Sequence, residues 1–251
     1  MWRMTIQEML HRFSRLVKVI GEDSFKTLND KCVLVLGVGG VGGYTVEALA
    51  RSGIGKLIIV DFDDVDETNI NRQIIATANT VGKSKVEVTK ERILSINPSS
   101  NVKTFETFIL EDSLETICFE NVDYVVDCID TISGKIAIIK KAKELNIPII
   151  SSMGTGNKLD PLQFKITDIS KTSVCPLAKV MRYELKKRNI KNVKVLFSTE
   201  IPIDLSNNEL EKKLLQDEAS VKHQIPGSVS FVPSIAGLLI AREIILNLLK
   251  G

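Results

Sequence analysis

Cysteine and histidine are scarce in the 251-residue chain, which has four of the former and two of the latter. The cysteines, Cys32, Cys118, Cys128 and Cys175, include no Cys-x-x-Cys pair, so the spacing of a four-thiolate zinc site is missing and we expect no zinc. So few cysteines in a long chain do not make a disulfide framework either, and we expect reduced thiols in a cytoplasmic protein. Two histidines leave little room for histidine-based metal or acid–base chemistry.

Long uninterrupted hydrophobic runs are also missing. Residues 1–19 lack the continuous apolar stretch of a secretory signal. The apolar stretch 229–249 is interrupted by Pro233, Arg242 and Glu243, so its unbroken run is well short of the roughly 20 residues that a membrane span needs. We expect a buried helix there and no stable membrane span. The apolar content of 44% excludes a disordered or collagen-like chain.

Strands alternate with helices over residues 31–155, which indicates a parallel sheet. The strands are predicted at 31–37, 56–61, 102–108, 122–128 and 147–151, and the helices at 41–51, 83–96 and 133–145. The predicted fold is therefore α/β, with a Rossmann-like, doubly wound, mainly parallel sheet. We expect one domain over 1–251, in which 31–155 is the nucleotide-binding core.

Two flanking regions complete this domain. Residues 1–30 form a helical segment with one or two amphipathic helices over 5–29. The C-terminal α/β extension, 156–251, has predicted strands at 162–168 and 193–200 and a helix at 175–188. The polar segment 204–224 is expected to be a mobile loop.

A glycine-rich loop, GVGGVG, follows the first predicted strand and opens a helix. Gly37, Gly39, Gly40 and Gly42 permit a tight turn and let backbone N–H groups approach phosphates at the helix N-terminus. Asp61 ends the next strand 19 residues after Gly42, where a ribose-binding acid is expected. A plain turn is the alternative for the loop alone, but its context and Asp61 favour a nucleotide site.

Nicotinamide dehydrogenases and ATP-using enzymes share this pattern, and the polar residues after the second strand separate them. The candidate ATP-binding residues of this region are Asp63, Asn69, Arg72, Gln73 and Lys85. A redox enzyme does not need Arg72 and Lys85 beside the phosphates. An adenylating enzyme does, because the α-phosphorus gains charge as a carboxylate attacks and pyrophosphate leaves. Each residue alone could be a solvated surface charge; the full set also disfavours a non-catalytic nucleotide-binding scaffold.

Two carboxylates end the fourth predicted strand, at the edge of the sheet where such folds bind ligands. Asp130 is suited to hold Mg²⁺ against the phosphates, because this ion prefers carboxylate, water and phosphate oxygens. The alternative is that Asp127 or Asp130 caps the helix near Ser133. We expect a structural role for Asp127 and metal binding by Asp130.

The stretch GVGGVGGYTVEALARSGIGKLIIVDFDDVDETNINRQ, followed by VGKSK and DCID, closely resembles the MoeB/ThiF group of ubiquitin-activating-like adenylating enzymes. The resemblance runs through the first 155 residues. It implies that the glycine loop, Asp61, Arg72, Gln73 and Lys85 bind ATP and that Asp130 binds Mg²⁺. It also implies that Arg15, in RFSRL, reaches into the ATP site of a partner subunit, and hence a homodimer. The implied catalytic residues are Arg15, Arg72, Lys85 and Asp130.

The segments KITDISKT, PLAKVMRYELKKR and VLFSTE, together with HRFSRLVKVIGEDSFKTL, resemble the tRNA threonylcarbamoyladenosine dehydratase branch of this group. MoeB and ThiF proteins normally carry two Cys-x-x-Cys zinc pairs, which this chain lacks. The branch implies ATP-dependent dehydration of the modified adenosine through an acyl adenylate of its threonyl carboxylate, closed by the neighbouring carbamoyl group. The alternative is adenylation of the C-terminus of a ubiquitin-like sulfur carrier protein, which would bring a sulfur-transfer partner.

Some members of the branch carry a cysteine just before the last helix, where this chain has PGSVSF. The departure argues against a sulfur-relay or thioester role in that stretch. Cys175 has Lys171 and Lys179 near it in sequence, but we interpret it as an ordinary loop cysteine.

The net charge of +2 conceals a basic segment. Residues 179–194 carry seven cations and one acid, a net +6, which leaves −4 for the other residues. Lys179, Arg182, Lys186 and Lys187 are the candidate tRNA-binding residues, because basic side chains on a helix face can follow phosphates. A solvated helix face is the alternative. With little aromatic material in this segment, base stacking is not expected to be its main contribution.

Overall fold

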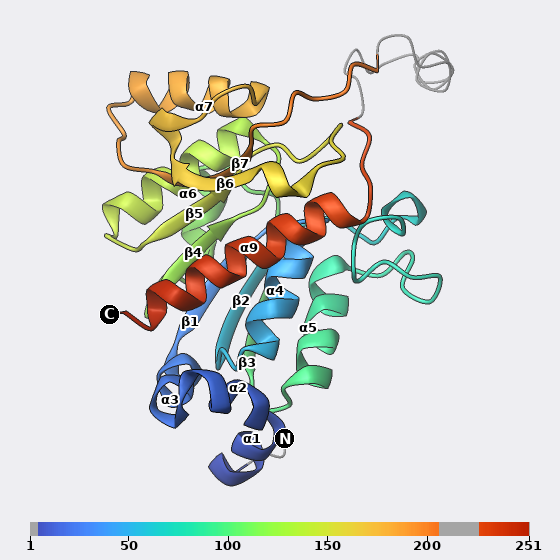
Figure 1. Ribbon diagram of the computed structural model, residues 1–251, viewed down its shortest axis with the longest axis vertical. Helices are drawn as coiled ribbons and strands as arrows, with labels where there is room; N and C mark the ends of the chain where they lie inside the picture. Colours follow the sequence, from blue (N-terminus) through green and yellow to red (C-terminus); the bar gives the residue numbers. More distant parts are fainter. Residues whose placement is uncertain (1–4, 206–225, 251) are drawn as a thin grey trace.

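The computed structural model describes residues 5–205 and 226–250. Its centre is a seven-stranded sheet in the order β3-β2-β1-β4-β5-β7-β6 (Figure 1). Neighbouring strands from β3 to β7 run parallel, and the edge strand β6 pairs antiparallel with β7. This confirms the predicted mainly parallel, doubly wound α/β sheet.

The strands are short and mostly buried. They are β1 (Cys32–Leu36), β2 (Lys56–Asp61), β3 (Asn101–Glu106), β4 (Tyr124–Asp127), β5 (Ile149–Ser152), β6 (Phe164–Asp168) and β7 (Lys194–Ser198). Every residue of β1, β4 and β5 is buried, since helices cover both faces of a parallel sheet. The predicted strands are confirmed, with ends that differ by up to two residues.

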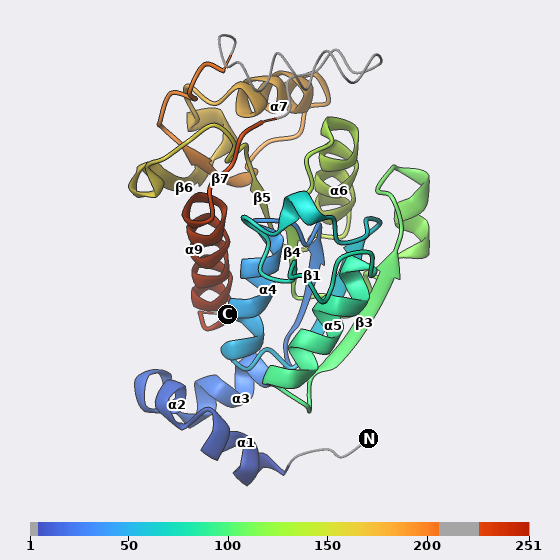
Figure 2. The same ribbon diagram turned by 90° about the vertical axis from the view of Figure 1, so that its right-hand side faces the viewer.

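Helices lie in two layers on opposite faces of the sheet (Figure 2). One layer comprises α4 (Gly42–Arg51), α5 (Lys85–Ile96) and α9 (Phe231–Leu248), and the other comprises α6 (Ile132–Glu144) and α7 (Pro176–Lys187). Alternate residues of β1 face the two layers: Val35 packs with the first and Leu34 with the second. Short 3₁₀ helices are η1 (Glu67–Asn69), η2 (Asp112–Thr116), η3 (Pro161–Gln163) and η4 (Ile169–Lys171).

The N-terminal segment forms three helices rather than the one or two expected, namely α1 (Ile6–Arg12), α2 (Ser14–Ile20) and α3 (Glu22–Asp30). The helical conformation is interrupted at Phe13 and again at Gly21, whose φ of 85° ends α2. These helices lie at the amino-terminal edge of the sheet (Figure 1), where Arg12 Nη1 donates to Ile96 O over 3.1 Å.

The apolar stretch near the C-terminus forms α9, which packs against α4. A Cβ on Gly237 would lie 2.3 Å from Val41 O, and Thr45 Oγ1 donates to Gly237 O over 3.2 Å, so the two backbones nearly touch. By length and composition α9 could cross a membrane, but half of it is buried in the fold. From residue 206 on, the loop expected at 204–224 lies outside the described residues.

Candidate nucleotide-binding site

The glycine loop follows β1 and has the shape of a phosphate-binding turn. Gly37 has φ of 85° and donates its N–H to Val60 O at 2.7 Å. A Cβ on Gly42 would lie 1.8 Å from Gly37 O, so the turn excludes any side chain there. A Cβ on Gly39 would meet nothing closer than Gln73 Nε2, at 3.7 Å. Gly42 therefore serves the fold, whereas Gly39 leaves room for a ligand to approach the backbone.

Gly40 contacts the start of α9. A Cβ on Gly40 would lie 3.1 Å from Pro233 Cβ and 3.7 Å from Arg72 Cγ. The loop is therefore enclosed by a helix that is almost two hundred residues away in sequence.

Asp61 lies beside the loop, as predicted. Its buried carboxylate accepts from Val38 N at 2.7 Å and from Asp63 N at 3.0 Å, which ties the loop to the end of β2. Each carboxylate oxygen has more than one lone pair, so Asp61 can still accept from ribose hydroxyls. Asp61 therefore shapes the loop and keeps acceptor sites on its carboxylate.

Lys85 is the first residue of α5 and its side chain is only 6% exposed. Its Nζ lies 2.6 Å from Asp63 Oδ2, and Asp63 is itself 44% exposed. A buried ammonium thus depends on one carboxylate that is open to solvent. A phosphate arriving at the loop would offer this ammonium a second anion.

Asn69 is the last residue of η1, which follows β2, and Arg72 lies just after it. Arg72 Nη1 donates to Thr68 O at 2.7 Å and to Asn71 Oδ1 at 3.0 Å. Asn69 is buried, and its Oδ1 accepts from Asp66 N at 3.4 Å in the capping box of η1. Asn69 therefore stabilises the turn, while Arg72 keeps donors on its guanidinium for a ligand.

Gln73 has a buried side-chain oxygen that is available to a ligand. It is buried beside Gly39, and its Oε1 has no hydrogen-bond partner among the described residues. Leaving such an oxygen unsatisfied costs about 1–3 kcal/mol. The amino and hydroxyl groups of a nucleotide are donors that could satisfy it, so the residues present fit the predicted ATP.

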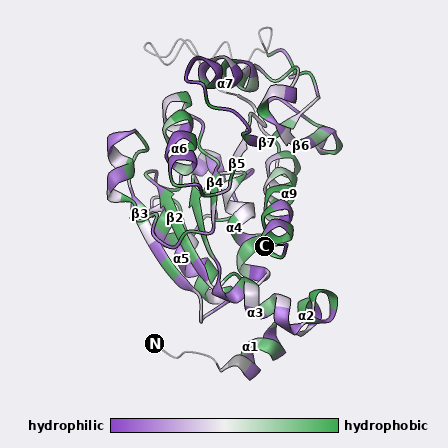
Figure 3. Cartoon of the chain, turned by 90° about the vertical axis from the view of Figure 1, so that its left-hand side faces the viewer, coloured by the Kyte–Doolittle hydropathy of each residue, from purple (hydrophilic) through white to green (hydrophobic). Residues whose placement is uncertain are grey.

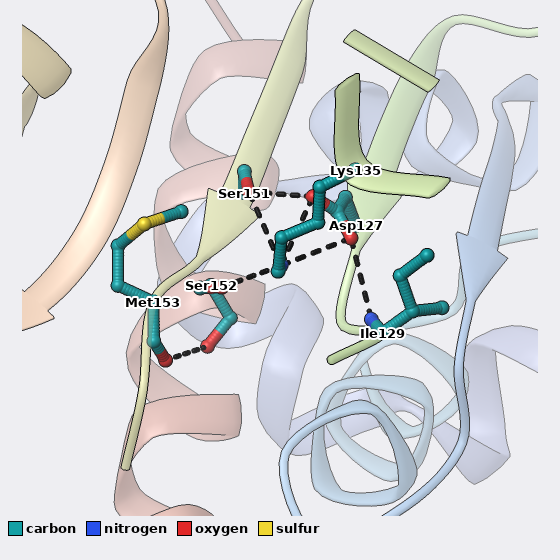
Figure 4. Close-up of polar contacts among 6 residues, drawn as sticks. All are labelled: Asp127, Ile129, Lys135, Ser151, Ser152 and Met153. Carbon is teal, nitrogen blue, oxygen red and sulfur yellow. Dashed lines mark hydrogen bonds and ion pairs between the residues drawn. The ribbon is translucent and has the colours of Figure 1, made fainter. Parts of the chain in front are cut away.

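Asp127 belongs to a buried network, as the structural role predicted for it requires (Figure 4). Its two oxygens each lie 3.1 Å from Lys135 Nζ, and one accepts from Ser151 Oγ at 2.5 Å. The other accepts from Ile129 N at 3.3 Å, while Lys135 also donates to Ser152 O at 2.7 Å. Asp127 and Lys135 are both fully buried. Lys135 could not be predicted from the sequence, because nothing in the helix pattern distinguishes an inward-facing lysine.

Asp130 is exposed just beyond this network and forms no ion pair with the described residues. In the described ranges, no three or more His, Cys, Asp or Glu residues come together as a metal site. Mg²⁺ bound with a nucleotide needs only one or two carboxylates, because water and phosphate oxygens complete its shell. A single free carboxylate therefore fits the predicted ion.

Arg15 lies on α2, exposed and without an ion pair to the described residues. It is at the amino-terminal edge of the sheet, whereas the glycine loop is at the carboxyl-terminal edge of β1 (Figure 1). The fold therefore does not bring Arg15 to the glycine loop of its own chain.

The cations of the basic segment, residues 179–194, lie on different elements of the fold, including α7 and β7. Its exposed members on α7 are Lys179, Lys186 and Lys187. Arg182 is half-buried and donates to Thr172 O at 2.9 Å, so its guanidinium serves the fold at least in part. Lys194 is on β7 and pairs with Glu243 at 2.7 Å, away from α7.

Two ionisable side chains, Cys128 and Lys158, have pKa values that burial shifts. Burial, and then the charge of Asp127, raise the pKa of Cys128 to about 12, so this thiol stays protonated and unreactive. Cys175 is buried at the N-cap of α7. Burial lowers the pKa of the nearby Lys158, against the charges of Cys175 and Glu200. Lys158 is a buried cation that sequence analysis did not single out.

A glycine loop, a buried lysine, an arginine and an unsatisfied amide meet at the carboxyl edge of a doubly wound sheet, which defines a nucleotide-binding α/β protein. The model of the ThiF family matches residues 13–251. The chain belongs to the ThiF family.

Relatives within the family differ in how much of the chain they match. A tRNA threonylcarbamoyladenosine dehydratase of Bacillus subtilis is 46% identical over 245 residues, 96% of either chain. The crystal structure of the Escherichia coli enzyme TcdA in complex with ATP superposes with a TM-score of 0.84 at 31% identity, covering 96% of this chain and 95% of that one. A probable molybdopterin-synthase adenylyltransferase of Porphyra purpurea is 37% identical over 131 residues, 52% of this chain and 33% of that protein.

Proposed function

We propose that this protein is an ATP-dependent tRNA threonylcarbamoyladenosine dehydratase. The observation that carries the proposal is the extent of the similarity. The Bacillus subtilis dehydratase and the Escherichia coli dehydratase structure each match 96% of this chain, whereas the adenylyltransferase matches 52% of it.

ATP binding follows from the geometry of the loop. The N–H groups of Gly37 and Val38 are taken up by Val60 O and Asp61, so the N–H groups at the N-terminus of α4 would be the ones that donate to the phosphates. Asp61 and Gln73 supply acceptors for the nucleoside, while Lys85 and Arg72 supply positive charge for the phosphates. Mg²⁺ would be held by Asp130, and it would neutralise charge on the leaving pyrophosphate.

The proposed reaction has two steps. A carboxylate oxygen of the threonyl group attacks the α-phosphorus of ATP, and pyrophosphate leaves. A nitrogen of the neighbouring carbamoyl group then attacks the acyl carbon, loses its proton, and AMP leaves. The nucleoside loses one water, while ATP becomes AMP and pyrophosphate. Since the attacking group belongs to the substrate, no enzyme nucleophile is needed.

A homodimer completes this site in our proposal. Arg15 is exposed at the edge of the sheet opposite the glycine loop, so it can meet a nucleotide only on another copy of the chain. We propose that the Arg15 side chain contacts the phosphates bound by a second subunit. Mixing Arg15→Ala with Arg72→Ala should then restore activity, because one site in the mixed dimer has both arginines. Dimers shown to mix but lacking activity would contradict an action across the interface.

Mass spectrometry of nucleosides tests the reaction itself. tRNA carrying threonylcarbamoyladenosine is incubated with the protein, ATP and Mg²⁺, and the modified nucleoside should lose one water. Conversion without ATP, or none with it, would contradict the proposal. The second candidate, adenylation of a sulfur carrier protein, predicts AMP release only when a small carrier with a free C-terminus is added. A cytoplasmic location is part of the proposal, and the four free cysteines support it.

A further inference from the structure

The outer face of α7 presents one aromatic ring among lysines. Tyr183 is 66% exposed, and its hydroxyl makes no hydrogen bond with the described residues. Lys179 is one turn before it, Lys187 one turn after it, and Lys186 lies on the same side of the helix. The three lysines are exposed and form no ion pair within the described ranges. These four residues are called the α7 face below.

The α7 face takes no part in holding the helix on the protein. Ala178, Met181 and Leu185 are buried and attach α7 to the core. Glu184 is the only acid of the helix, and it forms an ion pair with Arg188. The exposed side of α7 is mainly hydrophilic (Figure 3), and no acid among the described residues pairs with its three lysines. It therefore suits an anionic partner.

The position of α7 relates this face to the nucleotide site. A Cβ on Gly154, just after β5, would lie 3.9 Å from both Cys175 Sγ and Leu177 Cβ at the start of α7. The helix therefore begins at the carboxyl edge of the sheet, the same edge as the glycine loop (Figures 1 and 2). A polymer whose reacting group lies at that edge can extend along α7.

We propose that Tyr183 stacks on an unpaired base of the tRNA, while Lys179, Lys186 and Lys187 contact the adjoining phosphates. The inference rests on the proposed function, and adds to it a residue that recognises unpaired RNA. Enzymes that do chemistry on a base act on a base that is single-stranded or flipped out of a duplex, so the reacting base and its neighbours are expected to be unpaired in the complex. Proteins bind such splayed bases by stacking them on aromatic rings, with cations along the backbone. From the sequence, base stacking was not expected to be the main contribution of this segment, because the sequence does not show that Tyr183 is exposed between the lysines.

Binding measured at several salt concentrations separates stacking from charge. With tRNA carrying threonylcarbamoyladenosine, Tyr183→Ala should raise Kd about tenfold at every salt concentration. For this variant, the slope of log Kd against log salt concentration should equal that of the wild type, because no cation is lost. Lys186→Ala and Lys187→Ala should each reduce that slope by about one, and Tyr183→Phe should bind like the wild type. Leu162→Ala, at a side chain 91% exposed on η3, and Lys103→Ala, an exposed cation on β3, are the matched controls.

A fluorescent ring at the same position reports contact directly. Tyr183→Trp in a Trp2→Phe background has a single tryptophan, since Trp2 is the only one in the chain. Its emission should be quenched by the tRNA and not by a ubiquitin-like carrier protein. Emission that changes with the carrier alone, or a Kd unchanged in Tyr183→Ala, would overturn the inference.

Wild-type activity tells the two proposals apart. If the wild type dehydrates the tRNA and Tyr183→Ala binds it with an unchanged Kd, the stacking proposal is contradicted and the proposed function is not. A wild-type protein that neither binds nor dehydrates the tRNA contradicts the proposed function as well.

Discussion

Lys135 on α6 and Asp127 at the end of β4 form an ion pair with both side chains fully buried. The Lys135 Nζ lies 3.1 Å from each carboxylate oxygen and also binds Ser152 O of β5. The pair therefore joins one helix to two strands, immediately before the turn that presents Asp130. Its charges are satisfied only as long as both partners are present.

Replacing Lys135 by Met should destabilise the fold strongly. Asp127 would be left as an unpaired buried charge, which costs about 3–5 kcal/mol in free energy of unfolding. Lys141→Met is the matched control: Lys141 is on the same helix and pairs with Glu115, which is 73% exposed. The free energy of unfolding should fall by less than about 1 kcal/mol in Lys141→Met. Urea denaturation compares the two, and equal losses would show that the buried pair has no special weight.

Two alanine substitutions in the glycine loop should have different effects. Gly42→Ala places a methyl group 1.8 Å from Gly37 O, so it should lower both the melting temperature and ATP affinity. Gly39→Ala finds space, at 3.7 Å from Gln73 Nε2, and should keep the melting temperature within a few degrees. It should nevertheless weaken ATP binding, because the methyl group occupies the approach to the backbone. Calorimetric titration with ATP would show this, and unchanged affinity in Gly39→Ala would place the phosphates elsewhere.

Arg72→Ala and Asp130→Ala should each abolish AMP formation from ATP and the modified tRNA. Neither residue is buried, so the circular dichroism spectrum and melting temperature should be those of the wild type. Asp112→Ala removes an exposed carboxylate on η2 and should leave activity unchanged. Wild-type rates in either site variant would refute its assignment.

Stability should fall in acid partly through Glu47. Burial raises the pKa of this carboxyl, but hydrogen bonds from Arg92 and Arg51 outweigh burial and lower the pKa below 4.5. A carboxylate favoured in the folded state stabilises the protein above its ordinary pKa, and this contribution is lost as pH falls through the lowered value. Glu47→Gln should therefore be less stable at pH 7 and lose less stability on acidification. Thermal unfolding from pH 7 to pH 3 measures this, with Glu22→Gln at an exposed helix ion pair as the control.

The elements that leave a local pattern of apolar residues or a fixed spacing in the sequence could be predicted from it. Continuous apolar runs in β1, β2 and β4 identified buried parallel strands, and the spacing from Gly42 to Asp61 located the nucleotide site. Contacts between distant residues leave no such pattern. The pairing of Asp127 with Lys135 and the exposure of Tyr183 depend on which side of a helix meets the sheet. The break at Gly21 was missed because the apolar spacing continues across it.

The close contact of α4 with α9 also has a consequence for the order of folding. Gly40 lies against Pro233 and Gly237 against Val41, so the first helix of the nucleotide core is covered by residues near the end of the described chain. Such a contact spans most of the sequence, and loops of that length close late and slowly. During synthesis the glycine loop would leave the ribosome long before α9. We expect the nascent chain to acquire its affinity for ATP only after α9 has emerged and docked.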